Sequence, residues 1–328
     1  MLTRPIDILT QFPIRKSKKQ KEEFRDAVIA YLEQQDYQCT VEKGIFGTRN
    51  LVAGDPENAK FVLTAHYDTC AKLPLPNLLT PFNPILFVMY QIALVAFLLL
   101  IALAMSLVVG FLTIRIGAPM IAPDRVMDLV EFAVEVWYAS FIIFIYLIDW
   151  MIYFGPANQN NANDNTSGVV TLLEIARTLP ENQREKVCFV LFDLEEKGLW
   201  GSKAYRKAHK KATDHQLILN LDCVGDGDHI RLFPTKKLKK DRKKLTSLYK
   251  ACGYVGKKSI LVHEKGFGIY PSDQRNFPYG VGICALRKNK YCYYLGRIHT
   301  KKDTVLDEEN VNILRAALTS FISCDAVN

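Results

Sequence analysis

Two long apolar runs dominate the pattern of hydrophobic and polar positions along the chain. Residues 85–109 contain no charged side chain, and a helix of this length can cross a bilayer core of roughly 30 Å. Residues 132–154 form a second run, which carries Glu135 near one end and Asp149 near the other. Aromatic side chains typical of membrane interfaces flank its uncharged centre: Trp137, Tyr138, Trp150 and Tyr153. The pattern predicts a transmembrane helical hairpin with a polar connection at residues 113–131; a pair of buried core helices is the alternative.

Outside these runs, the pattern alternates between strand-like and helix-like segments. Alternating or continuous apolar positions predict strands at residues 37–42, 49–53, 61–64, 187–192, 217–221, 281–286 and 291–295. Helical spacing and terminal signals predict helices at residues 18–35, 166–179, 201–211, 236–252 and 308–322. The strands at 187–192 and 217–221 are apolar throughout or nearly so, as in strands buried on both faces. This alternation predicts an α/β domain with a largely parallel sheet.

The composition divides the chain into two unlike parts. The 328 residues are 49% hydrophobic and 23% charged, with a formal charge of +8, which excludes a disordered or collagen-like chain. The mean hydropathy is only +0.02. This value is an average, because residues 80–155 contain only two of the 42 basic residues, Arg115 and Arg125. The positive charge therefore belongs almost wholly to the predicted α/β domain.

Basic residues are densest at residues 236–244. Such a run is typical of a solvated helix face, and contact with anionic lipid near a membrane is the functional alternative. Because aromatic residues are not interleaved with these lysines, the run does not indicate a nucleic-acid partner.

The eight cysteines and the N-terminal segment bear on the cellular compartment. No two cysteines form a C-x-x-C pair, so a cysteine-based zinc site has little support, and we predict buried, reduced thiols. Residues 1–21 contain Pro5, Asp7, Pro13 and a basic run in place of the apolar core of a secretory signal. We therefore expect the α/β domain to lie on the cytoplasmic face of the membrane.

Candidate metal-ligating side chains follow the ends of several predicted strands, the edge at which open α/β sheets bind ligands. They are His66 and Asp68 after the strand at 61–64, Glu195 and Glu196 after 187–192, Asp222 after 217–221, His299 after 291–295, and Asp164 just before the helix at 166–179. Imidazole and carboxylate together suit zinc, and cobalt or manganese less selectively. A single His or carboxylate at one of these five chain positions is typical of a surface group. All five positions together, each at a strand end or a helix start, predict a metal centre.

These residues lie in motifs that together are specific. The motifs are His66-Tyr67-Asp68, Asn163-Asp164-Asn165-Thr166-Ser167-Gly168, Glu195-Glu196, Asn220-Leu221-Asp222 and His299-Thr300-Lys301-Lys302-Asp303-Thr304. With them, the sequence resembles the M28 family of co-catalytic zinc peptidases, over roughly residues 17–79 and 156–328. The resemblance implies a three-layer α/β/α zinc-exopeptidase fold with a mixed, centrally parallel sheet.

The resemblance also implies a role for each residue. The metal ligands would be Asp164 as a bridge between two zinc ions, His66 and Asp222 at one ion, and Glu196 and His299 at the other. Glu195 would act as the general base of peptide hydrolysis. Asp68 would orient His66 through its second ring nitrogen.

The sequence departs from the family pattern at residues 272–274. Ser-Asp-Gln stands there, where relatives often have Ser-Asp-His in a substrate-facing stretch, and this leaves the residue preference open. An aminopeptidase is the first interpretation. The alternatives are a carboxypeptidase or glutaminyl-cyclase-like enzyme on the same fold, or a catalytically silent membrane receptor or adaptor.

The order of the candidate ligands constrains the membrane topology. His66 precedes the apolar hairpin and Asp164 follows it, so a single crossing would place two halves of one site on opposite sides. Two crossings keep them together, which predicts a peptidase domain in two parts, 1–79 and 156–328, interrupted by the insert 80–155. Because the tethers are short, we expect the centre to lie near the bilayer and to act on hydrophobic or membrane-proximal peptides.

Overall fold

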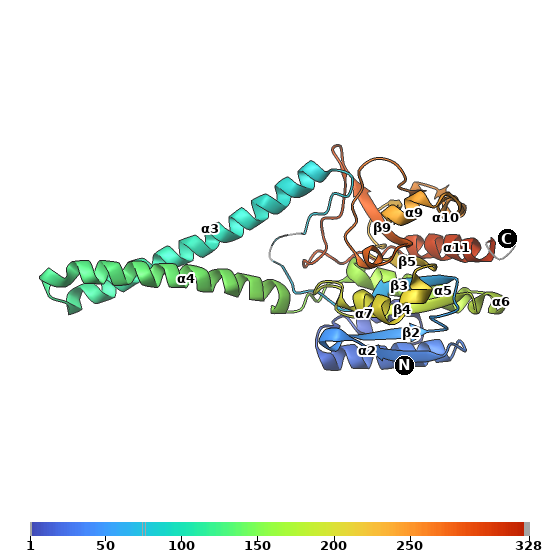
Figure 1. Cartoon of the computed structure of the whole chain (residues 1–328), viewed down its shortest axis with the longest axis horizontal. Coiled ribbons are helices and arrows are strands. Elements are labelled where there is room, and N and C mark those ends of the chain that lie inside the picture. The colour runs from blue at the N-terminus through green and yellow to red at the C-terminus, as the bar shows by residue number, and fades with distance from the viewer. Residues whose placement is uncertain (1, 74, 76, 325–328) are drawn as a thin grey trace. The chain divides into compact units, whose positions relative to one another are not determined.

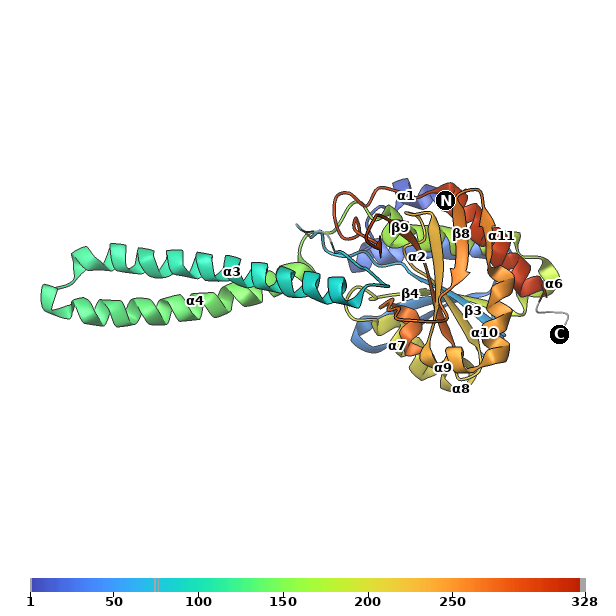
Figure 2. The ribbon, with the colours of Figure 1, turned by 90° about the horizontal axis from the view of Figure 1, so that it is seen from above.

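The computed structural model describes residues 2–73, 75 and 77–324. They fall into two units, an α/β unit made of Met1–Pro84 and Ala157–Asn328, and a helical unit, Ile85–Pro156, that interrupts it in sequence. Figures 1 and 2 show the elements of both units.

The α/β unit is built on one mixed sheet. Its strands are β1 (Cys39–Lys43), β2 (Arg49–Ala53), β3 (Phe61–His66), β4 (Val187–Phe192), β5 (Leu217–Leu221), β6 (His229–Pro234), β7 (Gly253–Val255), β8 (Lys258–Val262), β9 (Gly280–Lys288) and β10 (Tyr293–Tyr294). Their order is β1-β2-β4-β3-β5-β9-β6-β8-β7, with β10 paired to β9. Strands β4, β3, β5 and β9 are parallel, whereas β2 and β6 join them in antiparallel pairs. The prediction of a mixed, centrally parallel sheet is therefore confirmed.

Helices cover both faces of this sheet. The helices of the α/β unit are α1 (Ile8–Gln11), α2 (Lys18–Glu33), α5 (Gly168–Thr178), α6 (Glu181–Arg184), α7 (Trp200–Ala208), α8 (Lys210–Thr213), α9 (Lys236–Lys240), α10 (Arg242–Leu248) and α11 (Glu308–Cys324). In β3, Leu63 and Ala65 belong to a core shared with α2, α5 and α11, whereas Val62 belongs to a second core that contains Tyr205 of α7. Since neighbouring strand residues point to opposite faces, these two cores make the three layers of an α/β/α fold.

The sequence pattern misplaced several elements of this unit. The single helix predicted over residues 236–252 is wrong, because the backbone at Asp241 is extended and breaks the run into α9 and α10. The Asp241 side chain then accepts a hydrogen bond from the Lys244 N–H and caps α10. Strand β6 was not predicted, because His229 and Arg231 interrupt its apolar positions. Strands β7 and β8 were also missed.

The helical unit consists of α3 (Pro84–Gly117) and α4 (Val126–Phe154). Both helices extend beyond the apolar runs, so the connection predicted at residues 113–131 is wrong; the turn occupies only the residues between Gly117 and Val126. Isolated charges such as Asp128 do not end a helix. Pro119, two residues after the end of α3, cannot continue that helix, because proline lacks the backbone N–H and fixes φ.

The two helices of this unit approach each other through small residues. Ala102, Ser106 and Gly110 recur every four positions on one face of α3 and are buried. A Cβ atom added to Gly110 would lie 3.1 Å from the Cβ atom of Trp137 on α4, tighter than most contacts of this kind. Small residues at such spacing are typical of helix pairs that pack within a bilayer.

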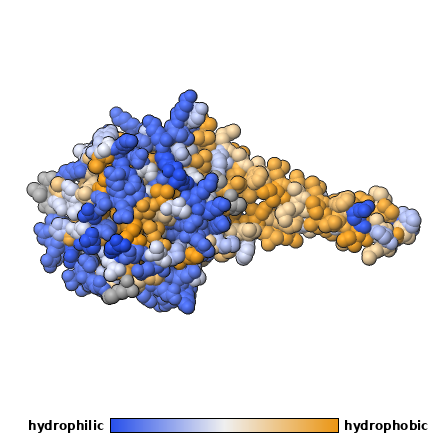
Figure 3. Space-filling view, turned by 180° about the vertical axis from the view of Figure 1, so that it is seen from behind, coloured by the Kyte–Doolittle hydropathy of each residue, from blue (hydrophilic) through white to orange (hydrophobic). Residues whose placement is uncertain are grey.

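The rest of the helical unit exposes apolar side chains, as Figure 3 shows for one face. By length and composition, two helical segments are able to cross a membrane. They are Pro84–Met120 and Pro123–Phe154, whose most apolar 18-residue windows have mean hydropathies of 3.1 and 1.7. Near the turn, the chain becomes polar, and Arg125 pairs with Asp128 at 2.8 Å between exposed side chains.

Candidate metal centre

The side chains predicted to bind metal come together at the carboxyl ends of three adjacent parallel strands. His66 ends β3, Glu195 and Glu196 follow β4, and Asp222 follows β5. Asp164 and His299 come from the loops before α5 and after β10. Strands β4, β3 and β5 are neighbours in the sheet, so their ends lie at one edge.

Asp164 lies between the two histidines. Its Oδ1 atom is 3.2 Å from His66 Nε2, and its Oδ2 atom is 3.0 Å from His299 Nε2. His66 Nε2 is also 3.7 Å from an oxygen of Asp222, and His299 Nε2 is 3.3 Å from an oxygen of Glu196. One carboxylate therefore presents one oxygen to each of two histidine–carboxylate groups.

The donor atoms of these residues fit divalent metal ions. Among the described residues, the groups with ligand atoms within 4.8 Å of one another include His66 with Asp164 and Asp222, and Glu196 with His299 and Cys70. Two buried polar atoms, Glu196 Oε1 and His66 Nδ1, have no hydrogen-bond partner in this part of the chain. Buried polar atoms are normally paired, so an unpaired carboxylate oxygen among imidazole donors is typical of a cation site.

Asp68 positions the glutamate pair. Its Oδ1 atom accepts a hydrogen bond of 3.0 Å from the backbone N–H of Glu195, and its Oδ2 atom accepts one of 3.3 Å from the N–H of Glu196. The predicted contact with His66 is longer, at 3.6 Å between Asp68 Oδ1 and His66 Nδ1. The Asp68 carboxylate thus fixes the backbone from which both glutamates project.

Burial and mutual charge shift the titration of this cluster. Burial raises the pKa of Glu195 well above its usual value, and it raises that of Glu196 to about 8. Burial opposes protonation of His299, but Glu196 and Asp164 raise its pKa to about 9. Burial would raise the pKa of Asp164, yet hydrogen bonds to His299 and His66 lower it below its usual value. The cluster therefore holds fewer negative charges at neutral pH than its carboxyl groups could supply.

Asp303 fixes the backbone of Asp164, a role that the sequence did not reveal. Its Oδ1 atom accepts from the N–H of Asn163 at 2.9 Å, and its Oδ2 atom accepts from the N–H of Asp164 at 3.0 Å. Burial and the charge of Asp164 raise the pKa of Asp303 to about 7. The only signal was its place four residues after His299 in the last motif.

A second missed residue is Arg15, which is fully buried behind the centre. Its guanidinium donates to the backbone oxygens of Tyr67 and Phe12 at 2.6 and 2.7 Å, and to the Thr166 hydroxyl at 3.0 Å. Burial lowers its pKa to about 10, against the opposing effect of Asp68 and Asp164. The sequence gave no signal, because Arg15 opens a run of lysines that resembles an exposed basic segment.

The stretch at residues 272–274, expected to face substrate, is buried, and Gln274 lines part of a cavity. Ser272, Asp273 and Gln274 are each at most 2% exposed. Asp273 accepts a hydrogen bond from the Ser202 hydroxyl, and burial raises its pKa to about 7. The Gln274 amide donates to the backbone oxygen of Tyr270 at 2.7 Å. The buried hydrogen bonds of these side chains thus stabilise the conformation of the loop.

A cavity of about 510 Å³ borders this loop. Tyr270 and Gln274 form part of its wall, together with apolar side chains such as Phe233 and cationic ones such as Lys236. The Tyr270 hydroxyl also donates to the backbone oxygen of Asp222 at 3.0 Å, so one residue contacts both the cavity and a candidate ligand.

The fold and the cluster define a metallopeptidase with a three-layer α/β/α architecture. The model of peptidase family M28 matches residues 149–320, more than half of the chain, and the chain belongs to this family. Family membership implies zinc as the metal. No match is found among curated proteins.

Solved structures show the same fold. The LapA aminopeptidase of Legionella pneumophila has a TM-score of 0.53 and 15% identity, covering 97% of this chain and 67% of that one. The glutaminyl cyclase of Fimbriiglobus ruber has a TM-score of 0.52 and 16% identity, covering 97% of this chain and 93% of that one. At such identities, the likeness describes the fold alone.

Proposed function

We propose that this metallopeptidase is a membrane-anchored di-zinc aminopeptidase. The observation that carries the proposal is the position of Asp164, whose two oxygens face histidines from two separate ligand groups. A carboxylate in this position can bridge two ions.

In this proposal, each ion has its own protein ligands. His66 and Asp222 bind the first ion, Glu196 and His299 bind the second, and Asp164 binds both. Zinc, when bound, supplies a Lewis acid that polarises the scissile carbonyl and lowers the pKa of a water molecule.

Glu195 acts as the general base. Its backbone is fixed by Asp68, and its carboxylate lies beside His66 and Glu196, where it can accept a proton and then return it. Its side chain takes a proton from the attacking water and passes it to the leaving amine. Glu196 is already committed to His299, which leaves Glu195 free for this transfer.

The helical unit anchors the enzyme by two crossings of the membrane. Support comes from its exposed apolar surface and from the small-residue contact between α3 and α4. Asp164 follows Pro156 by eight positions, which limits the distance between the two residues to roughly 28 Å of extended chain. Hydrophobic or membrane-proximal peptides are therefore the substrate class.

The α/β unit lies on the cytoplasmic side. All eight cysteines are free thiols, including the exposed Cys324, as in proteins of reducing compartments. Labelling Cys324 with a membrane-impermeant maleimide in sealed cells and in lysed cells tests this orientation. Labelling only after lysis is expected, and equal labelling of intact cells would place the unit outside.

The catalytic assignment is tested with Glu195→Gln in the full chain in detergent. Turnover of a peptide library is expected to fall about 10²–10⁴-fold, while mass spectrometry of metals still finds two zinc ions per chain. Glu185→Gln, at an exposed position after α6, is the matched control and should turn over normally.

Three results would contradict the proposal. Normal turnover by Glu195→Gln would remove the assigned base. Trimming from the carboxyl end would make the enzyme a carboxypeptidase. One tightly held ion, with cyclisation of amino-terminal glutamine, would make it a cyclase.

A further inference from the structure

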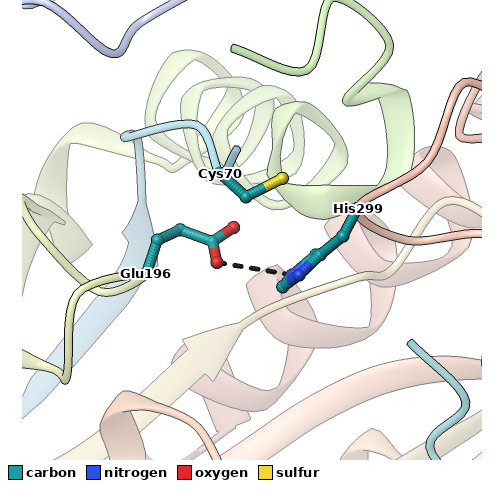
Figure 4. A group of neighbouring side chains, drawn as sticks. All are labelled: Cys70, Glu196 and His299. Carbon is teal, nitrogen blue, oxygen red and sulfur yellow. Dashed lines mark ion pairs between the residues drawn. The ribbon is translucent and has the colours of Figure 1, made fainter. Parts of the chain in front are cut away.

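A sulfur atom adjoins the ligand group around His299. The Sγ atom of Cys70 and the ligand atoms of Glu196 and His299 all lie within 4.8 Å of one another. Figure 4 shows the three side chains, with the Glu196 carboxylate paired to the His299 ring and the thiol beside them. Cys70 is only 5% exposed, so its thiol is part of the centre rather than of the surface.

The backbone holds Cys70 in this place from both sides. The N–H of Thr69 donates to the backbone oxygen of Arg15 at 3.2 Å, and the N–H of Asn158 donates to that of Cys70 at 3.1 Å. Ala71 then forms a bridge with Ala157. A side chain fixed by its backbone loses little freedom on binding, which favours a preformed ligand.

A second observation points to a cation beside the thiol. The Glu196 side chain is about nine-tenths buried, and its Oε1 atom has no hydrogen-bond partner among the described residues. Its other oxygen contacts His299 at 3.3 Å. A buried carboxylate oxygen without a hydrogen-bond partner, next to an imidazole nitrogen and a thiol, forms a group of atoms that can ligate a metal ion.

We propose that Cys70 is a further ligand of the metal ion held by Glu196 and His299. The inference rests on the proposed two-metal site. On binding, the thiol releases its proton to solvent and a bond forms between Sγ and the ion, with no change of oxidation state. With Asp164, the second ion then has four protein donors, one of them soft.

The soft donor makes the two metal positions unequal. The position at His66 and Asp222 has only nitrogen and oxygen donors, whereas a thiolate selects zinc or cadmium over manganese at the other. The sequence argued against this arrangement, because Cys70 has no partner cysteine at C-x-x-C spacing. Only the fold places it beside a histidine more than two hundred positions away.

Cobalt(II) titration of the metal-free full chain, in detergent and under reducing conditions, tests the proposal. A thiolate bound to cobalt gives an intense near-ultraviolet charge-transfer absorption that nitrogen and oxygen ligands do not give. We expect this absorption in the wild-type protein and its loss in Cys70→Ala and Cys70→Ser. The weaker of the two cobalt sites in Cys70→Ala should lose at least about 10-fold in affinity.

Cys188→Ala is the matched control, since Cys188 is buried in β4 away from the ligands and should leave the absorption intact. Circular dichroism shows whether each variant is folded. If the wild-type protein binds two cobalt ions without the charge-transfer absorption, Cys70 is not a ligand, but the di-metal proposal stands. If the wild-type protein binds fewer than two ions, the di-metal proposal fails and this inference with it. Absorption that persists in folded Cys70→Ala also overturns it.

Discussion

The two units of this chain differ in which side chains they bury and which they expose. The α/β unit buries charged groups such as Arg15, Asp164 and Asp303 and gives them hydrogen-bond partners. The helical unit buries mainly small residues such as Ala102 and Gly110 and exposes large apolar ones. The first arrangement suits water, where exposed apolar surface is costly, and the second suits lipid, where it is not. The two units therefore differ in which kind of side chain they bury and which kind they leave exposed.

The largest expected effect removes a buried charge from the α/β unit. Arg15→Met leaves the backbone oxygens of Tyr67 and Phe12 without their donor. We expect a loss of about 3–5 kcal/mol in the free energy of unfolding, measured by denaturant titration of the full chain in detergent. The exposed Arg4→Met is the control and should leave the midpoint unchanged. Equal midpoints for the two variants would show that burial of Arg15 has no energetic role.

A smaller effect is expected from a substitution that distinguishes a lipid environment from water around the helical unit. Leu100 in α3 is 62% exposed, and Leu100→Asp would change little if water surrounded it. In a bilayer centre, the same change costs about 2.5–3.5 kcal/mol of insertion free energy. We expect reduced recovery in the membrane fraction, measured by quantitative fractionation. Val255→Asp, at a 49% exposed apolar position of the α/β unit, should fractionate as wild type. If both variants behave alike, the helical unit does not face lipid.

The most gradual effect is a pH dependence confined to the α/β unit. The folded state holds a proton on Asp303 up to about pH 7 and on His299 up to about pH 9, above the usual pKa of each group. The unfolded chain releases both protons earlier, so the stability of metal-free protein should fall between about pH 4 and 9. The slope should be about 1.4 kcal/mol per pH unit for each group.

Thermal unfolding of chelator-treated protein at pH 6, 7 and 8.5 checks this slope. Added zinc should reverse the trend, because its ligands bind in deprotonated form. Asp303→Asn should flatten the lower part of the curve. A metal-free protein that becomes more stable as the pH rises would show that other groups control the titration.

Much of the fold could be predicted from local pattern. Strands β2, β4 and β5 matched their predicted bounds, because β4 and β5 are largely apolar runs and β2 ends at the turn that follows Ala53. The breaks at Asp241 and the polar positions of β6 could not be predicted, because a side-chain cap and pairing with β8 and β9 decide them. Local propensity is a weak guide wherever a distant partner supplies the hydrogen bonds.

The sequence by itself determined where the candidate ligands lie along the chain: imidazole and carboxylate side chains follow successive strands, and two long apolar segments lie between His66 and Asp164. Only the tertiary structure decided which of these side chains contact one another. It placed Asp164 between two histidines, put the Asp303 carboxylate under the Asp164 backbone, and brought Cys70 beside Glu196. The physical reason is that a motif fixes residue types along the chain, whereas a contact depends on how strands and loops far apart in sequence pack together.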